Sequence, residues 1–535
     1  MNYKYYPMHM HLHAACDYGS SMALDMYNAS LLGMKYIWFT DHDTRMVRRE
    51  NEVKGFSFDT SDLMKEDGKR FEGFKVIDEK TDYIINPEEK TLTLNCEGEG
   101  DNWETSGVFF ASSGTRHTCS LATELTLSVD IKDYVIDSDT RIIFGVKLSQ
   151  RPPEMANAYM LYVVGEAEDL SGLPHTQIIP SEIKKGQFVM KVSEDVSDEP
   201  SIGGKDNAFD TLYIILQSRN GKKASLKVGD FSISRVYYGE ELRKRLNTAS
   251  QKAGEYYGVT PFVSFEISGA GEHKNCFSTK VPVIDYYEYD YNVSEKEAID
   301  HTLKYDGIFA LNHPFETKPF KGKGNLPEEE KIKMFQDLYE EFYKNDTYGA
   351  SLIEVGYPEG RNFPFEYYTF LWDALSLSGH FLAGYGCNDC HRNNKGWFDG
   401  NNFAAYIGVD SSLEHPVSVD EFISAMKERR MYTADPVKIK GEIKFETASG
   451  EQMGSILNKK EEIINFYAEN TLPGWEFRLI NNGVEAYREK IKGNTYSHTS
   501  CLKSSDKPVD FQRAELYDED GRCILLTNPI YLTAK

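Results

Sequence analysis

Two short histidine motifs constrain the fold of this chain more than any other feature. His11 and His13 are separated by one residue, and Thr40-Asp41-His42 follows about thirty residues later. In an extended segment, side chains at positions i and i+2 point to the same face, so both imidazoles can turn toward one small volume. The sequence therefore predicts a metal site where this strand ends.

The residues between the two motifs predict a β-α-β unit. The serine pair 20–21 can cap a helix that runs to about Leu32, and Gly33 suits the end of that helix. The run 35–39 is typical of a strand. Because the carboxyl ends of parallel strands lie at the same edge, we expect the histidine at 42 to lie near the histidine at 13.

Three later segments repeat the pattern of an apolar strand followed by polar side chains. The run 261–266 ends in Glu266, and His273 follows after a short loop. The runs 307–311 and 381–385 are followed by Asn312-His313-Pro314 and by Asn388-Asp389-Cys390-His391. Seven of the thirteen histidines thus fall at or near predicted strand ends: His9, His11, His13, His42, His273, His313 and His391. So many coincidences favour a shared site over isolated core or surface histidines.

These segments resemble the signature motifs of the polymerase and histidinol phosphatase (PHP) superfamily, in the same order along the chain. The run 34–43 and the segment Leu526–Leu532 resemble its carbaryl-hydrolase-like branch. The resemblance implies an α/β fold, a distorted (β/α)7 barrel, with two or three divalent ions, commonly zinc, manganese or iron. It implies nine metal ligands: His11, His13, Asp17, His42, Glu266, His273, His313, Asp389 and His391.

Two positions depart from the usual PHP pattern. Ala14 stands where the family often has serine or threonine, and the spacing to the acidic ligand at Asp17 is variable in the family. His9 also offers a second register, His9-Met10-His11. The register of His11 and His13 is favoured, because Gly19 and Ser21 then fall where the family turn and helix begin.

The spacing of the motifs predicts an inserted domain. More than 200 residues separate His42 from Glu266, far more than one crossover helix requires. Much of the intervening chain alternates as strands do, for example at 91–94, 125–131, 141–148, 159–164 and 212–216. We expect a β-sandwich or jelly roll resembling carbohydrate-binding modules. The predicted organisation is barrel (1–55), insert (56–237), barrel (238–435) and a C-terminal β-domain (436–535).

Composition limits the partners of this chain. Its 535 residues carry a formal net charge of −24, which disfavours a nucleic-acid surface. No segment has the length and apolarity of a signal peptide or membrane span, so we expect a cytoplasmic protein without a membrane partner. Cys387 and Cys390 are expected to pack beside the metal site rather than form a redox pair. Arg45, Arg48 and Arg49 are either a solvated cluster or, at Arg45, a contact to an anionic substrate group.

The expected chemistry is metal-assisted hydrolysis. Divalent ions held by imidazole and carboxylate lower the pKa of a bound water and polarise the bond under attack. By resemblance, Asp389, Glu266 and His313 are the catalytic residues. We expect a small-molecule or sugar-bearing ester substrate and favour a phosphoester, with a carboxyl or carbamate ester as the alternative. A third hypothesis is an inactive PHP scaffold whose insert binds glycan or protein. The oligomeric state stays open.

Overall fold

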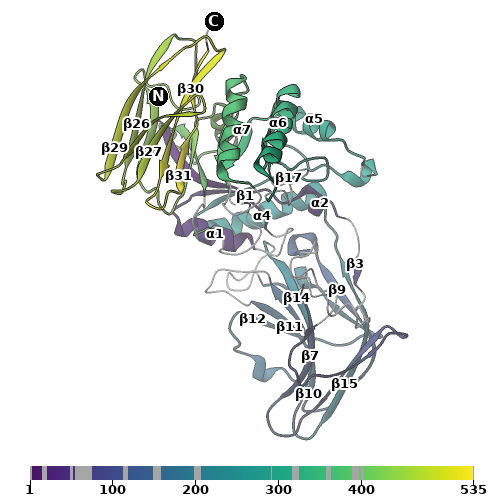
Figure 1. The fold of residues 1–535 in the computed structure, drawn as a ribbon. Coiled ribbons are helices and arrows are strands. Elements are labelled where there is room, and N and C mark those ends of the chain that lie inside the picture. Colours follow the sequence, from purple (N-terminus) through teal and green to yellow (C-terminus); the bar gives the residue numbers. More distant parts are fainter. Residues whose placement is uncertain are drawn as a thin grey trace.

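The computed structural model describes residues 3–14, 21–48, 52–54, 75–111, 119–148, 158–197, 206–290, 292–315, 325–356, 363–387, 389, 397–398 and 403–533. The predicted ligands Asp17 and His391 lie outside these described residues, as does Cys390. The fold is mixed α/β and consists mostly of strands. In Figure 1 the C-terminal strands lie at the upper left, helices α5, α6 and α7 at the upper right, and the inserted strands below.

The largest sheet contains the strand that ends in the first histidine motif. Its hydrogen-bonded order is β16 (Thr260–Val263), β2 (Tyr36–Phe39), β1 (Tyr3–Leu12), β22 (Ala404–Asp410), β23 (Met431–Ala434), β31 (Cys523–Thr527), β30 (Val509–Tyr517), β27 (Glu476–Asn481) and β28 (Val484–Lys490). The short strands β25 (Ile456–Leu457) and β32 (Ile530–Thr533) extend it. Strands β1, β2 and β16 are parallel, so their carboxyl ends share one edge.

A second sheet supplies the other polar segments. Its order is β17 (Phe265–Ile267), β18 (Lys274–Phe277), β19 (Ile308–Leu311), β20 (Leu352–Gly356) and β21 (Ala383–Gly386). An isolated parallel bridge between His42 and Glu266 connects it to the first sheet. These strands therefore form two separate sheets, and the predicted distorted (β/α)7 barrel is not shown.

Helices accompany these two sheets. They are α1 (Met22–Leu31), α2 (Asp43–Met46), α4 (Gly239–Tyr257), α5 (Glu295–Lys304), α6 (Glu328–Lys344), α7 (Phe365–Leu377) and α8 (Val419–Lys427). The predicted cap of the first helix is confirmed at Ser21, whose side chain accepts a hydrogen bond from the Leu24 N–H. Gly258 ends α4 in the left-handed conformation, with a φ of 66°. Glycine adopts that conformation at little steric cost.

The inserted segment forms two sheets that pack face to face. One has the order β12 (Thr176–Pro180), β11 (Tyr159–Gly165), β10 (Thr140–Leu148), β14 (Ala208–Ser218), β7 (Glu104–Ala111) and β4 (Lys75–Val76), with β8 (Cys119–Ser120) on β14. The other has β13 (Gln187–Met190), β9 (Thr126–Val135), β15 (Lys223–Ser234), β6 (Thr91–Glu97) and β5 (Asp82–Asn86), with β3 (Glu52–Lys54) on β15. The short helix α3 (Val192–Asp195) follows β13. Both sheets contribute to one apolar core, in which the rings of Phe144 and Phe188 stack with centroids 4.0 Å apart.

The insert begins and ends at neighbouring strands. Near its start, β3 pairs antiparallel with the end of β15, so that Lys54 lies opposite Phe231 and Glu52 opposite Ile233. Helix α4 begins a few residues after β15, at Gly239. The chain therefore leaves the histidine-bearing sheet and returns to it at adjacent points.

The C-terminal strands continue the first sheet across the predicted boundary at residue 436. β31 pairs with β23, and β24 (Ile443–Thr447), β26 (Glu461–Glu469) and β29 (Thr495–Lys503) form a separate three-stranded sheet. Asn482 and Gly483, with φ of 52° and 78°, make the tight turn between β27 and β28. Buried Arg513 on β30 donates two hydrogen bonds of 2.8 Å to Asp373 on α7. This ion pair links α7 to the first sheet.

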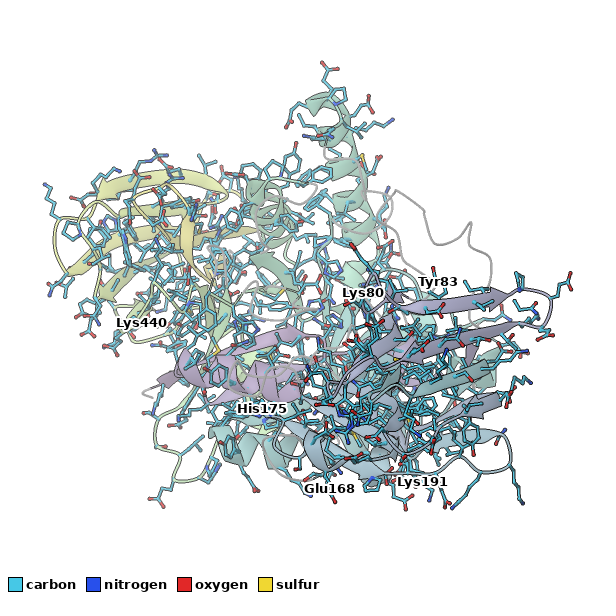
Figure 2. All side chains as sticks on the ribbon, turned by 90° about the horizontal axis from the view of Figure 1, so that it is seen from below. Lys80, Tyr83, Glu168, His175, Lys191 and Lys440 are labelled. Carbon is cyan, nitrogen blue, oxygen red and sulfur yellow. The ribbon has the colours of Figure 1, made fainter. Side chains whose placement is uncertain are left out.

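The outer surface of the insert carries charged side chains as well as exposed apolar ones such as Ile84 and Val135. Figure 2 shows Lys80, Glu168 and Lys191 projecting from its edges, and these side chains are exposed. Among the described helices, none has the length and apolarity needed to cross a bilayer.

Candidate metal centre

The backbone brings three histidines to one edge of the first sheet. Strand β1 ends just before His13, and the Thr40 N–H donates to the carbonyl of Leu12 at 2.8 Å. The carboxylate of Asp41 accepts a hydrogen bond of 2.5 Å from the Ala14 N–H, which ties the two motifs together. His42 follows directly.

His11 and His13 face each other closely. Their Nε2 atoms are 3.0 Å apart, and both side chains are fully buried. Glu266 lies beside them, with carboxylate oxygens 3.5 Å from His11 Nε2 and 3.8 Å from His13 Nε2. Asp389 Oδ1 is 3.5 Å and 3.4 Å from the same two nitrogens. These four residues thus converge on one small volume, as the motifs predict.

Glu266 also joins two further histidines to the cluster. Its Oε2 is 3.0 Å from His42 Nε2, and its Oε1 is 3.2 Å from His273 Nδ1. The Asn312 side-chain amide donates to Oε1 at 2.6 Å. Glu266 is therefore the residue best placed to bridge two ions, since its two oxygens face different histidines.

The buried carboxylates are balanced by imidazoles. Every ion pair that Glu266 and Glu354 make within the described chain is with a histidine. Burial raises the pKa of the Glu266 carboxyl, but the charges of His273 and His42 more than offset this and hold its pKa well below the usual range. Burial lowers the pKa of His313, while its hydrogen bond to Glu354 and the charge of that carboxylate raise it to about 9. The interior thus favours positive charge, which divalent ions would supply.

The spacing of the donor atoms tests whether an ion fits. For zinc bonds of about 2.0–2.2 Å in a tetrahedron, neighbouring ligand atoms lie roughly 3.3–3.6 Å apart. The separations between His11, His13, Glu266 and Asp389 are 3.0 to 3.8 Å. Among the described residues, four sets of ligand atoms each lie within 4.8 Å of one another: His11, His13 and Asp389; His13, His42 and Glu266; His11, Glu266 and His313; and His11, Glu354 and Cys387. The donors present therefore fit more than one divalent ion.

Two of the candidate ligands have unusual backbone conformations. His313 has a φ of 24° and Asp389 a φ of 45°, in the region that residues with a Cβ seldom adopt. Such strain clusters at functional sites, where the surrounding structure holds it in place.

The site opens toward solvent at His273, whose side chain is 32% exposed, whereas those of His11 and His13 are fully buried. A cavity of about 220 Å³ adjoins it and is also lined by Asn312, Pro314 and Phe342.

Other predicted positions have separate surroundings. The ring nitrogens of His9 have no hydrogen-bond partner among the described residues, and its ring packs against Trp397 with centroids 4.3 Å apart. The register of His11 and His13 is therefore the one that converges.

Arg45 lies in the last turn of α2, just after the second motif, and is half-buried. In the insert, the guanidinium groups of Arg141 and Arg219 lie 4.0 and 4.5 Å from the ring centroid of Trp103.

Glu354 is a residue of the site that the sequence motifs do not predict. This residue is fully buried on β20, and its carboxylate contacts His11 and His313. The sequence offers one weak signal for it, a lone acid in the apolar run Leu352–Gly356, every residue of which is buried in the structure. Cys387 lies beside the site, as predicted, and donates its S–H to Glu354 at 3.1 Å.

Comparisons with known proteins give limited matches. No protein-family model matches the chain. No curated protein matches it either. Among solved structures, the chain is similar to a two-domain protein from Bacteroides vulgatus described as containing a predicted PHP-like metal-dependent phosphoesterase. The match has 13% identity and a TM-score of 0.26, and covers 52% of this chain and 78% of the other.

Two further matches each cover about a third of this chain. One is a family 11 carbohydrate-binding module from Clostridium thermocellum, with 13% identity, a TM-score of 0.19, and coverage of 31% of this chain and 86% of the module. The other is a family 12 glycoside hydrolase, with 9% identity, a TM-score of 0.21, and coverage of 30% and 98%. The carbaryl-hydrolase-like branch finds no support among these matches. Because the TM-scores are low, the functional proposal rests on the geometry of the site.

Proposed function

We propose that this chain is a metal-dependent hydrolase of the PHP type that acts on a phosphoester. The observation that carries the proposal is the convergence of His11, His13 and His42 with Glu266 and Asp389 in a buried volume. Together with His273 and His313, these residues would hold two or three ions of zinc, manganese or iron. Asp17 and His391 complete the proposed ligand set by resemblance. The barrel architecture and the division of the chain near residues 55, 237 and 435 belong to the same proposal.

Ions bound here would supply a water of lowered pKa and would polarise the bond under attack. Asp389 would accept the proton of that water, because its carboxylate lies 3.4 and 3.5 Å from the two central imidazoles. Glu266 would hold the two halves of the centre together through its two oxygens. His313 would act in catalysis beside them, since its ring centroid lies 5.6 Å from that of His11. Substrate would approach through the cavity at His273.

The phosphoester is preferred to a carboxyl or carbamate ester because phosphoesters are the usual substrates of the superfamily that the motifs resemble. A sugar-bearing alcohol is compatible with the inserted β-sandwich. Trp103 is a poor candidate for stacking on a sugar, because two arginine side chains already lie against its ring.

The test is elemental analysis of protein purified without chelators, followed by a screen of aryl phosphates, phosphodiesters and aryl esters with the metals found. We expect at least two ions per chain and hydrolysis of a phosphate ester that stops when a chelator removes the metal. Less than one ion per chain would refute the proposal. Bound metal without hydrolysis of any ester would instead favour the inactive scaffold.

A further inference from the structure

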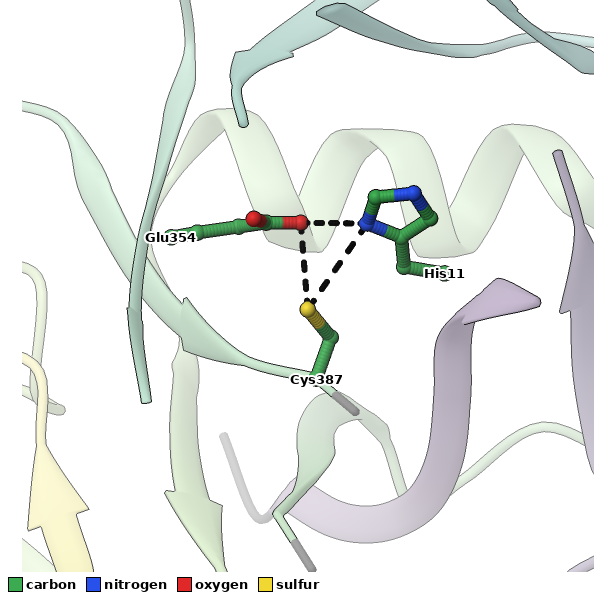
Figure 3. Close-up of side chains that lie close together, drawn as sticks. All are labelled: His11, Glu354 and Cys387. Atoms are coloured by element: carbon green, nitrogen blue, oxygen red, sulfur yellow. Dashed lines mark hydrogen bonds and ion pairs between the residues drawn. The ribbon is translucent and has the colours of Figure 1, made fainter. Parts of the chain in front are cut away.

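One carboxylate on β20 gathers an unusual number of hydrogen-bond donors. Glu354 Oε1 lies 2.6 Å from His11 Nδ1 and accepts from the Tyr385 hydroxyl at 2.8 Å and the Cys387 thiol at 3.1 Å. Its Oε2 accepts from the backbone N–H of His313 at 2.5 Å and lies 3.2 Å from that residue's Nδ1. Figure 3 shows Glu354, His11 and Cys387 meeting from three separate chain segments.

This cluster has the composition of a metal site, but its distances fit a network of hydrogen bonds. His11 Nδ1 and Glu354 Oε1 are closer than the roughly 3.3 Å expected for two ligands of one tetrahedral zinc ion. Cys387 Sγ lies 3.1 Å from Glu354 Oε1 and 3.7 Å from His11 Nδ1, so the thiol is placed to donate a hydrogen bond to the carboxylate.

The network fixes the protonation of His11. An ionised carboxylate only accepts hydrogen bonds, so the short contact requires the proton of His11 to lie on Nδ1. In a neutral ring with the proton at that position, the lone pair lies on Nε2, the atom that faces His13, Glu266 and Asp389. A ring held in this tautomer needs no rearrangement to bind a cation.

Glu354 acts on His313 through the backbone. The φ of 24° at His313 is unfavourable for a residue with a side chain, and the hydrogen bond from its N–H to Glu354 stabilises that conformation. The contact at Nδ1 orients the ring as well.

We propose that Glu354 is a positioning residue of the metal centre, which holds His11 in the tautomer, and both His11 and His313 in the orientation, that bind metal. This inference rests on the proposed function, because it assigns a role toward metal that the centre must first be able to hold. Only a carboxylate suits the position. A glutamine would turn an N–H₂ group toward one of the donors that now point at the two oxygens.

The test measures metal affinity rather than turnover. Metal-free wild-type protein, Glu354→Gln and Glu354→Asp are titrated with Zn²⁺ against a chromophoric chelator, and Co²⁺ is added separately for visible absorption spectra. Loss of a carboxylate partner of a ligating histidine typically weakens affinity by about 10- to 100-fold. We expect that loss in Glu354→Gln, together with a changed Co²⁺ spectrum. Glu354→Asp keeps the negative charge but has a side chain shorter by one methylene, and we expect its affinity for Zn²⁺ to fall by about tenfold.

The matched control is Asp373→Asn, which makes the same change of acid to amide at another buried position. Asp373 pairs with Arg513 and makes no contact with the metal centre among the described residues. This variant should melt at a lower temperature but bind Zn²⁺ like wild type, which separates loss of stability from loss of positioning.

The outcomes are distinguishable. If wild-type protein fails to bind Zn²⁺, the proposed function itself is wrong. If wild type binds and folded Glu354→Gln binds within twofold of it, the positioning role is overturned while the metal centre stands. Should Glu354→Gln not fold, Glu354→Asp decides, and unchanged affinity and spectrum in that variant would overturn the role.

Discussion

Replacing Asp389 by asparagine separates the chemistry of the site from its fold. The two side chains have nearly the same shape, and Asp389, three residues after the end of β21, is 7% exposed, so the core is left intact. The substitution removes a negative charge 3.4 to 3.5 Å from the two central imidazole nitrogens. It also removes the group proposed to accept the proton of the attacking water.

The size of the effect follows from these two losses. Removing a positioned general base lowers a rate by about 10²- to 10⁴-fold. At about 1.4 kcal/mol for each factor of ten, this corresponds to roughly 3 to 5.5 kcal/mol of transition-state stabilisation. Asp389 is also one of three donors in its group with His11 and His13, so metal retention should fall as well.

The assay compares initial rates on the best substrate of the screen, with metal content and thermal melts for each variant. The controls are His301→Ala and His498→Ala. His301 hydrogen-bonds to the carbonyl of Pro282 at 2.8 Å, and His498 stacks on Tyr487 in the C-terminal strands. Both controls should hydrolyse at the wild-type rate. If metal-loaded Asp389→Asn does so too, the assignment of Asp389 is refuted.

Three further predictions concern stability and organisation. Asp373→Asn leaves the buried Arg513 without its bidentate partner and should cost about 3–5 kcal/mol, measured by denaturant unfolding; a loss below 1 kcal/mol would contradict it. Ser418→Ala removes the capping box of α8 and should cost about 1 kcal/mol in the same assay, whereas Ser412→Ala outside any helix should cost less. Limited proteolysis near residues 55 and 237 should leave the two-sheet insert as one resistant fragment, and its digestion to small peptides before the rest of the chain would argue against an independent core.

Local signals allowed much of the secondary structure to be predicted. The helix cap at Ser21 is confirmed, because it depends on neighbouring residues alone. The convergence of His11, His13, His42 and Glu266 also follows from local rules, since each residue lies at or beside a strand end.

Long-range pairing could not be predicted in the same way. β31 joins β23 across about ninety residues, and nothing in either strand specifies the other as its neighbour. Glu354 could not be predicted for a related reason. A single acid in an apolar strand has no spacing pattern, and its role is visible only when His11, Tyr385 and Cys387 are brought around it.

The pairing of β3 with β15 has a consequence for how the chain assembles. Closing a flexible loop of about 180 residues costs roughly 4–5 kcal/mol in chain entropy. The inserted segment is a loop of this length in the unfolded chain, and it separates the ligands near His42 from those near Glu266. Once the insert has folded, Lys54 and Phe231 are already neighbours, and the chain left to close is about 12 residues on the side of His42 and about 35 on the side of Glu266, which include α4. Folding of the insert would therefore bring the ligands near His42 close to those near Glu266. A variant whose insert folds more slowly should also bind metal more slowly during refolding, by the same factor.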